Sequence, residues 1–126
     1  LYKQLKEKFP LMYNQGDVSV GEGWHKIVFE LLKMIQSHID HINNYCDRFP
    51  ERRKGERVEQ VKVTQVKEKF GGLRFYYEGG DEYCSGAMAM AEVMSGKICE
   101  VCGMRGIRRG KGWIRTLCNE HGKNED

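Results

Sequence analysis

The sequence has no long apolar run. Its apolar stretches all fall short of the roughly 20 residues that a helix needs to cross a bilayer, so no membrane-spanning segment and no membrane partner are expected. The first ten residues, LYKQLKEKFP, also lack the apolar segment of a secretory signal peptide. The chain is therefore expected to stay in the compartment in which it is made.

Recognisable catalytic patterns are missing as well. The GEGWHK stretch has neither the spacing nor the preceding strand of a dinucleotide-binding loop. Paired carboxylates, a Ser-His-Asp pattern and the histidines of an HNH nuclease cannot be identified. The sequence favours a non-enzymatic protein and leaves an enzymatic activity open as the less favoured reading.

A disulfide framework is not expected, because the five cysteines are an odd number. Three of them belong to a metal-type motif and two are isolated, which fits a reducing compartment such as the cytoplasm. At 126 residues, with 40% hydrophobic and 31% charged residues, the chain has the length and composition of one globular domain. The net charge of +3 permits an acidic partner without demanding one.

The apolar pattern predicts an α+β fold with two helices packed on a β-hairpin. Apolar residues recur at helical spacing from about Gly23 to Cys46, which predicts a long amphipathic helix. A shorter helix is expected between Asp81, a suitable N-cap, and Gly96. The apolar face of this shorter helix is expected to comprise Cys84, Ala87, Met88, Ala91 and Met94.

The remaining segments outside the hairpin read as short turns and loops. Residues 1–9 form a short amphipathic turn that Pro10 stops. The NQGD stretch at 14–17 has the composition of a turn, and the charged DRFPERRKGER stretch at 47–57 reads as a solvated connection.

A β-hairpin is expected between the helices. The Gly71-Gly72 pair suits a two-residue turn with positive φ, which would pair Phe70 with Leu73. Strict alternation then places Val61 and Val63 on the wrong face. A bulge, or cover on both faces, is therefore expected at that end of the hairpin.

The strongest motif lies near the C-terminus. Cys99-x2-Cys102 and Cys118-x2-His121 are separated by fifteen residues, which is the pattern of a zinc site. Three thiolates and one imidazole would occupy all four tetrahedral positions of Zn²⁺ and leave none for water, as is typical of structural zinc. Gly103 suits the positive φ that such a knuckle needs.

The segment between the ligand pairs is long enough for a two-stranded hairpin. A zinc ribbon and a treble clef are both compatible with the motif, and the short tail after His121 favours a ribbon-like or truncated-clef unit. We expect a helix–hairpin–helix core in residues 1–96 and a zinc-binding unit in residues 97–126, packed together as one domain. Zinc binding would then contribute to folding of this end.

Basic residues are concentrated around the predicted zinc ligands. Residues 97–123 contain seven Lys or Arg residues against two Glu residues. Phosphate contact with base stacking is one interpretation. A solvated face, a tryptophan that caps the zinc core, or pairing with Glu100 and Glu120 are the alternatives. The candidate binding residues are Arg105, Arg108, Arg109, Lys111, Trp113 and Arg115 in the loop and Lys67, Lys69, Arg74 and Tyr76 on the hairpin.

Other potentially reactive side chains have simpler interpretations. His38 and His41 share a helix face, but the sequence supplies no third metal ligand, so surface or packing histidines are favoured. Cys46 and Cys84 lie on apolar helix faces and are expected to be buried, unreactive thiols. The sequence also predicts that Arg108 and Arg109 can be replaced without unfolding the protein.

Three stretches resemble a family of small uncharacterised phage and prophage proteins: GEGWHKIVFELL, VKVTQVKEKFGGLRFYYEGG and ICEVCG…GWIRTLCNEH. The resemblance extends from about residue 10 to residue 121. It implies a cytoplasmic protein of an infected or lysogenic bacterial cell, with the four Cys and His residues above as zinc ligands. The family has no established activity, so no catalytic residue is implied, and the Arg108-Arg109 pair is not part of its pattern.

Two functional hypotheses follow. The first is a phage accessory protein that binds a host protein, such as a defence factor, and modifies or blocks it. It rests on the resemblance, the small size and the lack of catalytic groups. The second is a protein that binds DNA or RNA through the zinc-held basic loop. The sequence does not determine the oligomeric state.

Overall fold

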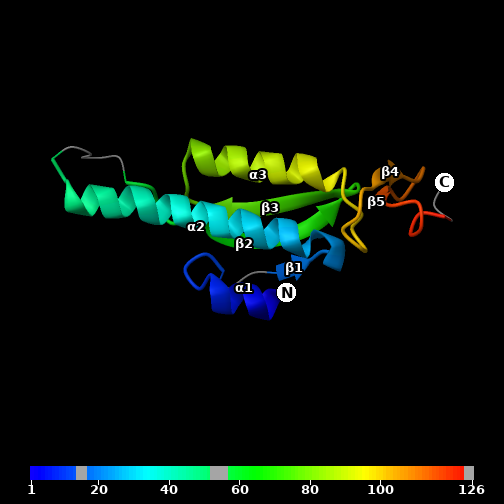
Figure 1. The fold of residues 1–126 in the computed structure, drawn as a ribbon, viewed down its shortest axis with the longest axis horizontal. Helices are drawn as coiled ribbons and strands as arrows, with labels where there is room; N and C mark the ends of the chain where they lie inside the picture. The colour runs from blue at the N-terminus through cyan, green and yellow to red at the C-terminus, as the bar shows by residue number, and fades with distance from the viewer. Residues whose placement is uncertain (14–16, 52–56, 124–126) are drawn as a thin grey trace.

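The computed structural model describes residues 1–13, 17–51 and 57–123. It shows an α+β fold in which α2 and α3 lie side by side along a small sheet (Figure 1). None of the helices in these ranges is both long and apolar enough to cross a membrane. The elements are α1 (Tyr2–Lys8), β1 (Asp17–Ser19), the 3-10 turn η1 (Glu22–Trp24), α2 (His25–Arg48), β2 (Lys62–Lys69), β3 (Gly72–Glu78), α3 (Glu82–Ser95), β4 (Ile107–Arg109) and β5 (Arg115–Leu117).

Both helices expected from the apolar pattern are present. α2 begins just after η1 and buries an apolar stripe against the rest of the molecule, as its spacing predicts. α3 begins after Asp81, whose carboxylate accepts a hydrogen bond from the backbone N–H of Cys84 at 3.1 Å. This is the N-cap that the sequence predicts, and Gly96 ends the helix as expected.

One expected core position of α3 is wrong. Met94 is exposed, and the neighbouring Ser95 is fully buried. The Ser95 hydroxyl accepts a hydrogen bond from the backbone N–H of Leu73 at 2.9 Å and donates one to the carbonyl of Glu92 at 2.6 Å. Because β3 is an edge strand, this serine satisfies a backbone donor that would otherwise stay unpaired.

The sheet contains a third strand, so the expected hairpin is only part of it. β1 pairs with β2 in parallel, with Val18 opposite Val66. The sequence pattern does not predict β1, because three residues are too few to show alternation. α1 is likewise a regular seven-residue helix that ends before Pro10. Residues 14–16 of the expected NQGD turn, and 52–56 of the charged connection, lie outside the described residues.

The register of the β2–β3 hairpin differs from the expected one. The turn residues are Phe70 and Gly71, with φ values of 54° and 80°, so Gly72 belongs to β3 and lies opposite Lys69. Two positive φ angles define a type I′ turn, which matches the twist of the two strands. The expected bulge is confirmed, because the register shifts between Val63 and Gln65.

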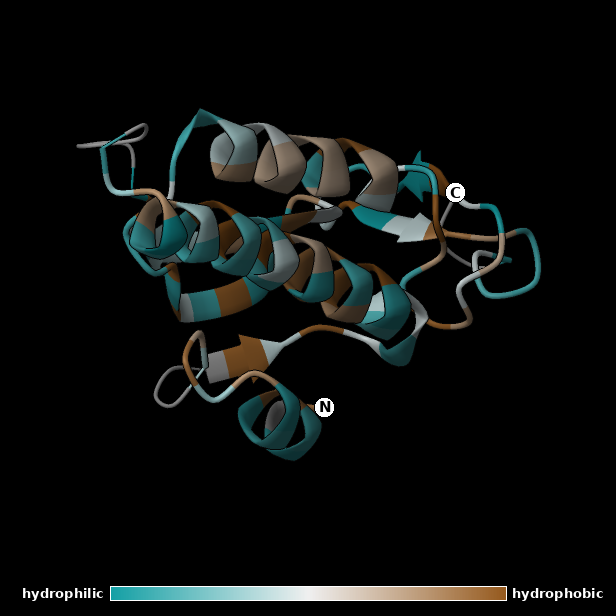
Figure 2. Cartoon of the chain, turned by 60° about the vertical axis from the view of Figure 1, so that its left-hand side comes forward, coloured by the Kyte–Doolittle hydropathy of each residue, from teal (hydrophilic) through white to brown (hydrophobic). Residues whose placement is uncertain are grey.

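The core lies between the two long helices and the sheet. Cys46 and Cys84 are buried free thiols, as expected. The outer side of α2 is largely hydrophilic, whereas α3 carries apolar residues on its outer side as well (Figure 2). The fully buried side chains include Trp24, Tyr13, Leu5, Met12, Leu32, Ile35, Ile39 and Leu73.

Candidate metal centre

The four expected ligands meet at one point. All their ligand atoms lie within 4.8 Å of one another. The Sγ atoms of Cys102 and Cys118 are 3.7 Å apart, and Nδ1 of His121 is 3.7 Å from Sγ of Cys99 and 3.2 Å from Sγ of Cys118. A tetrahedron with metal–sulfur bonds of about 2.3 Å has edges of about 3.8 Å. The spacing therefore fits a four-coordinate metal ion held by three sulfurs and one nitrogen.

A tight backbone turn presents the first two ligands. The N–H of Gly103 donates to the carbonyl of Cys99 at 2.9 Å, and the N–H of Cys99 donates to the carbonyl of Met104 at 2.7 Å. Gly103 has a φ of 81°, as the sequence predicts for this position. The chain thus doubles back on itself, which brings the Cys102 thiol beside that of Cys99.

A short hairpin returns the chain to the second pair of ligands. β4 and β5 are antiparallel, with Arg108 opposite Thr116, and confirm the two-stranded segment expected between the ligand pairs. After β5, the N–H of Gly122 donates to the carbonyl of Cys118 at 2.8 Å. This turn directs Nδ1 of His121 toward the Cys118 sulfur.

Backbone N–H groups favour thiolates in this cluster. Burial raises the pKa of the Cys99 thiol, but hydrogen bonds from the N–H groups of Cys102 and Cys118 outweigh burial and lower this pKa to about 6. A hydrogen bond from the N–H of His121 lowers the pKa of Cys118. The N–H of Met104 favours the Cys102 thiolate too, but burial and the neighbouring thiols raise the pKa of Cys102. Two of the three thiols are thus shifted toward the thiolate, which is the form that binds a metal ion.

The turn that carries Cys99 and Cys102 packs on η1, the segment that precedes α2. The indole Nε1 of Trp24 donates to the carbonyl of Ile98 at 2.8 Å, and the N–H of Gly23 donates to the carbonyl of Glu100 at 2.7 Å. A Cβ atom on Gly23 would lie 2.0 Å from the carbonyl oxygen of Cys99, so only glycine permits this approach. The GEGW stretch, where the sequence predicts the start of a helix, therefore also packs against the turn that carries Cys99 and Cys102.

A second set of contacts joins the β4–β5 hairpin to the β2–β3 turn. The hydroxyl of Thr116 donates to the carbonyl of Gly71 at 2.6 Å. The guanidinium of Arg108 hydrogen-bonds to the carbonyl of Phe70. Three stretches that are distant in sequence, around residues 21–24, 70–71 and 98–121, thus converge at one end of the molecule (Figure 1).

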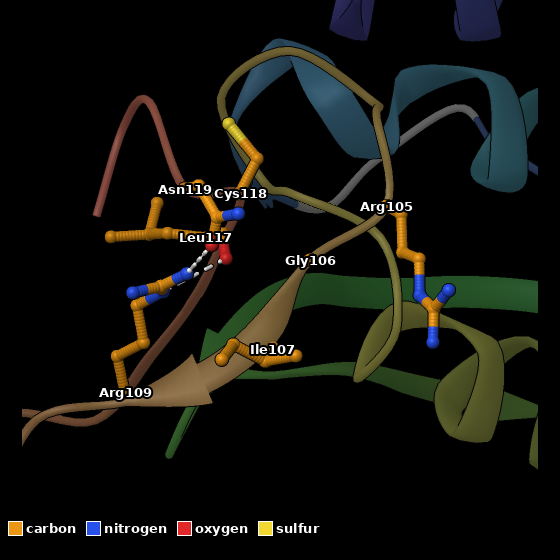
Figure 3. Close-up of a pocket in the computed structure, with 7 residues that line it drawn as sticks. All are labelled: Arg105, Gly106, Ile107, Arg109, Leu117, Cys118 and Asn119. Carbon is orange, nitrogen blue, oxygen red and sulfur yellow. Dashed lines mark hydrogen bonds between the residues drawn. The ribbon is translucent and has the colours of Figure 1, made fainter. Parts of the chain in front are cut away.

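Arg109 is a structural residue, in contrast to the surface role expected for it. It is only 8% exposed, and its guanidinium donates to the carbonyl of Leu117 at 3.1 Å and to the side-chain oxygen of Asn119 at 2.7 Å (Figure 3). It thereby ties β4 to the turn that carries the second ligand pair. Because of these contacts, we expect replacement of Arg109 to weaken the fold, unlike replacement of an exposed arginine.

The other basic candidates lie at the surface or are partly buried. Trp113 is exposed, with the guanidinium of Arg115 5.4 Å from its ring, so it does not cap the metal cluster. On the hairpin, Lys67 lies directly opposite Arg74, and its ammonium is 5.2 Å from the Tyr76 ring. A Gly71-Gly72 turn would also have placed Lys69 opposite Arg74, but in the observed register Lys69 lies opposite Gly72.

The nearby carboxylates do not neutralise these bases. Glu68 accepts a hydrogen bond from the N–H of Gly71, and the buried Glu100 accepts one from the N–H of Gly21. Glu120 pairs with Lys123. Within the described ranges, no ion pair forms at six basic residues: Lys67, Lys69, Arg74, Arg105, Arg108 and Lys111.

A second group of ligand-type side chains lies at the start of α3. Nε2 of His38 is 2.8 Å from the carboxylate of Asp81, and the Cys84 sulfur is close to both. The His38 ring stacks on Tyr83, with ring centroids 3.9 Å apart. Asp81 uses its other oxygen to cap α3. These contacts lock α2 to α3, in agreement with the packing role that the sequence favours for His38.

Comparison of the chain with protein-family models, with curated proteins and with solved structures finds no match. A function can therefore be inferred only from the chain's own residues. The Cys and His cluster and the basic residues near it are the two features with a recognisable chemistry.

Proposed function

We propose that the Cys99, Cys102, Cys118 and His121 cluster binds one structural Zn²⁺. Three thiolates and one imidazole form a common zinc donor set, and four protein ligands leave no position for a reacting water. The β4–β5 hairpin between the two ligand pairs supports the proposal that this unit is a zinc ribbon. The metal would fix the hairpin and the basic residues on and around it.

We further propose that this end of the protein binds nucleic acid. The observation that carries the proposal is a group of cations that form no ion pair within the described residues: Lys67, Lys69 and Arg74 on the β2–β3 hairpin and Arg105, Arg108 and Lys111 between the two ligand pairs. Nearby carboxylates are engaged by backbone N–H groups or by Lys123, so the positive charge is left for an external partner. A polyanion such as DNA or RNA would release counterions on binding to such a surface.

Three of the basic residues lie together in one groove. Arg74, Lys97 and Arg108 line a groove of about 600 Å³ between α3 and β3. The only carboxylate in its lining is Glu92, which accepts a hydrogen bond from the N–H of Phe75 at 3.1 Å. Three cations from separate elements thus share one concave site, as a phosphate-binding surface requires.

Fluorescence anisotropy with labelled 20-nucleotide probes tests the proposal. We expect binding at about 50 mM salt that weakens steeply toward 200 mM. Lys69→Ala and Arg105→Ala should each lower affinity and reduce the slope of log K against log salt by about one. Lys33→Ala, an exposed position on α2, is the matched control and should leave both unchanged. Absence of binding to any nucleic acid at about 50 mM salt contradicts the proposal.

A second candidate function is that of a phage accessory protein that binds a host protein in the bacterial cytoplasm. The observation in its favour is the outer side of α3, where Met90, Val93 and Met94 are exposed one helical turn apart. Methionine-rich surfaces adapt readily to protein partners. Such a patch lies on a different element from the basic residues, so the two functions can be separated.

Affinity purification from bacterial lysate, with and without nuclease, tests this candidate. One stoichiometric protein should be retained after nuclease treatment, and Met90→Lys should lose it. Lys3→Glu, an exposed change on α1, should retain it. Recovery of nucleic acid alone, or of a protein that the Met90→Lys variant also captures, rules this candidate out.

A further inference from the structure

The basic end of the molecule also exposes three aromatic rings. Phe70, Tyr76 and Trp113 are 61%, 40% and 71% exposed. Building on the proposed nucleic-acid function, we infer that the bound form is single-stranded DNA or RNA, with its bases stacked on these rings. Base–aromatic stacking is the main sequence-tolerant contact in such complexes.

Each ring has a cation beside it. The ammonium of Lys69 is 5.8 Å from the Phe70 ring, and the ammonium of Lys67 is 5.2 Å from the Tyr76 ring. The guanidinium of Arg115 is 5.4 Å from the Trp113 ring. A ring and an adjacent cation together can contact the base and the phosphate of one nucleotide. The arrangement is therefore repeated three times, at the β2–β3 turn, on β3 and in the segment between β4 and β5.

The backbone at Phe70 gives independent support. Phe70 adopts a φ of 54°, the left-handed region that bulky residues rarely occupy. Asn or Gly is the relaxed choice at the first central position of a type I′ turn. The phenyl ring is also largely exposed, so burial does not offset the strain. An exposed ring held in a strained conformation points to recognition rather than to folding.

The surface is poorly suited to read a duplex. Lys67 and Tyr76 are adjacent to Val66 and Phe75, which are buried in the core, so strand alternation directs Lys67 and Tyr76 to the other face of the sheet. The helices that cover the core are therefore not placed to enter a groove from this face. A β-ribbon can enter the major groove. In β4, however, Arg108 is held on the Phe70 carbonyl and Arg109 is buried, so neither is presented to base edges. The exposed rings are instead suited to stack on the faces of bases, which only an unpaired strand exposes.

The test compares a 20-nucleotide single strand, as dT and as rU, with a mixed-sequence duplex of equal length. The single strands should bind at least tenfold more tightly. Phe70→Asn should weaken single-strand binding roughly 5- to 150-fold, the range for loss of one stacked base, while its melting temperature stays level or rises because strain is relieved. Leu11→Asn, an equally exposed apolar position away from this end, should change neither affinity.

Tryptophan fluorescence gives a direct second readout. The chain has two tryptophans, of which Trp24 is fully buried and Trp113 is exposed. Binding of dT should quench the emission of Trp113, and Trp113→Leu should abolish the quenching. Equal or tighter duplex binding, or unchanged affinity in both ring variants, overturns the single-strand inference while the nucleic-acid function stands. Failure of every probe to bind at about 50 mM salt overturns both.

Discussion

The indole Nε1 of Trp24 donates a hydrogen bond to the backbone carbonyl of Ile98 at 2.8 Å. Trp24 is fully buried at the start of α2, and Ile98 directly precedes the first metal ligand. The bond therefore couples the central helix to the metal centre. Because the indole is fully buried, its N–H depends on this carbonyl for a partner.

Trp24→Phe should lower the free energy of unfolding by about 1–3 kcal/mol, since it leaves the Ile98 carbonyl unsatisfied. Urea denaturation monitored by circular dichroism measures this change. Trp113→Phe, at an exposed ring, should stay within about 0.5 kcal/mol of the parent. Equal stability of the two variants would show that the Trp24 bond contributes nothing net.

Gly23→Ala should destabilise the protein by about 3 kcal/mol, because the added Cβ would lie 2.0 Å from the carbonyl oxygen of Cys99. The clash is with backbone, so no side chain can move aside. Gly86 on the exposed side of α3 has no atom within 4 Å of its hypothetical Cβ. Gly86→Ala should instead stabilise the protein by about 0.5–1 kcal/mol. Thermal denaturation of both variants gives the comparison.

Metal analysis of the purified protein should find one equivalent of Zn²⁺. Cys118→Ser should lose it, whereas Cys46→Ala, which lies outside the cluster, should retain it. Strong chelators should unfold the C-terminal end, because metal-binding free energy contributes to folding there. Hydrogen exchange should then rise in residues 98–121 first and remain slow in α2. Retention of native exchange rates after complete zinc removal contradicts the structural role.

Arg109→Ala should lower the free energy of unfolding by about 2 kcal/mol, since charged hydrogen bonds to Leu117 and Asn119 are lost. Arg105→Ala, at an exposed arginine on the same segment, should leave stability within about 0.5 kcal/mol. The nucleic-acid experiments should show the reverse order, with Arg105→Ala affecting binding of the folded protein. A destabilised Arg105→Ala variant would contradict this division of roles.

Asp81 should make the stability depend on pH at the acidic end. Burial raises its pKa, but hydrogen bonds from His38 and from the N–H of Cys84 outweigh burial and lower it below 3.8. The folded state therefore stabilises the ionised form of Asp81 more than the unfolded state does. The resulting stability is present above about pH 4 and is lost as the pH falls through the folded-state pKa.

Asp81→Asn keeps a capping oxygen but removes this titration. Urea titrations between pH 6 and pH 3 should show a shallower loss of stability for the variant than for the parent. Asp40→Asn, on the exposed side of α2, is the control and should follow the parent curve. If the stability of the parent and of Asp81→Asn fell in parallel with pH, the Asp81 carboxyl would have the same pKa in the folded and unfolded states.

Features with a local signal could be predicted from the sequence. The convergence of the three cysteines and His121 follows from their spacing, and α2 follows from a long helical repeat of apolar residues. The N-cap at Asp81 and the positive φ of Gly103 each depend on a few neighbouring residues. The bulge near Val63 could be inferred, because two valines fell on the wrong face.

Features set by tertiary contacts could not be predicted in this way. The choice of Phe70-Gly71 over Gly71-Gly72 as the turn depends on contacts of Gly71 with β5, some 45 residues later in the chain. The burial of Arg109 depends on Asn119 across the hairpin. The packing of Gly23 against the Cys99–Gly103 turn could not be predicted from the sequence around Gly23. The backbone that it contacts lies near residue 99, far along the chain.

The hydrogen bonds between residues 21–24 and residues 98–100 also affect the order in which the protein folds during its synthesis. Almost 80 residues separate Gly23 from Glu100, so the contact between them cannot form until residues 98–100 have been synthesised. Contacts of such long range are slow to form. During synthesis, the indole N–H of Trp24 therefore gains its partner only after Ile98 and the cysteine-containing segment that follows it have been made.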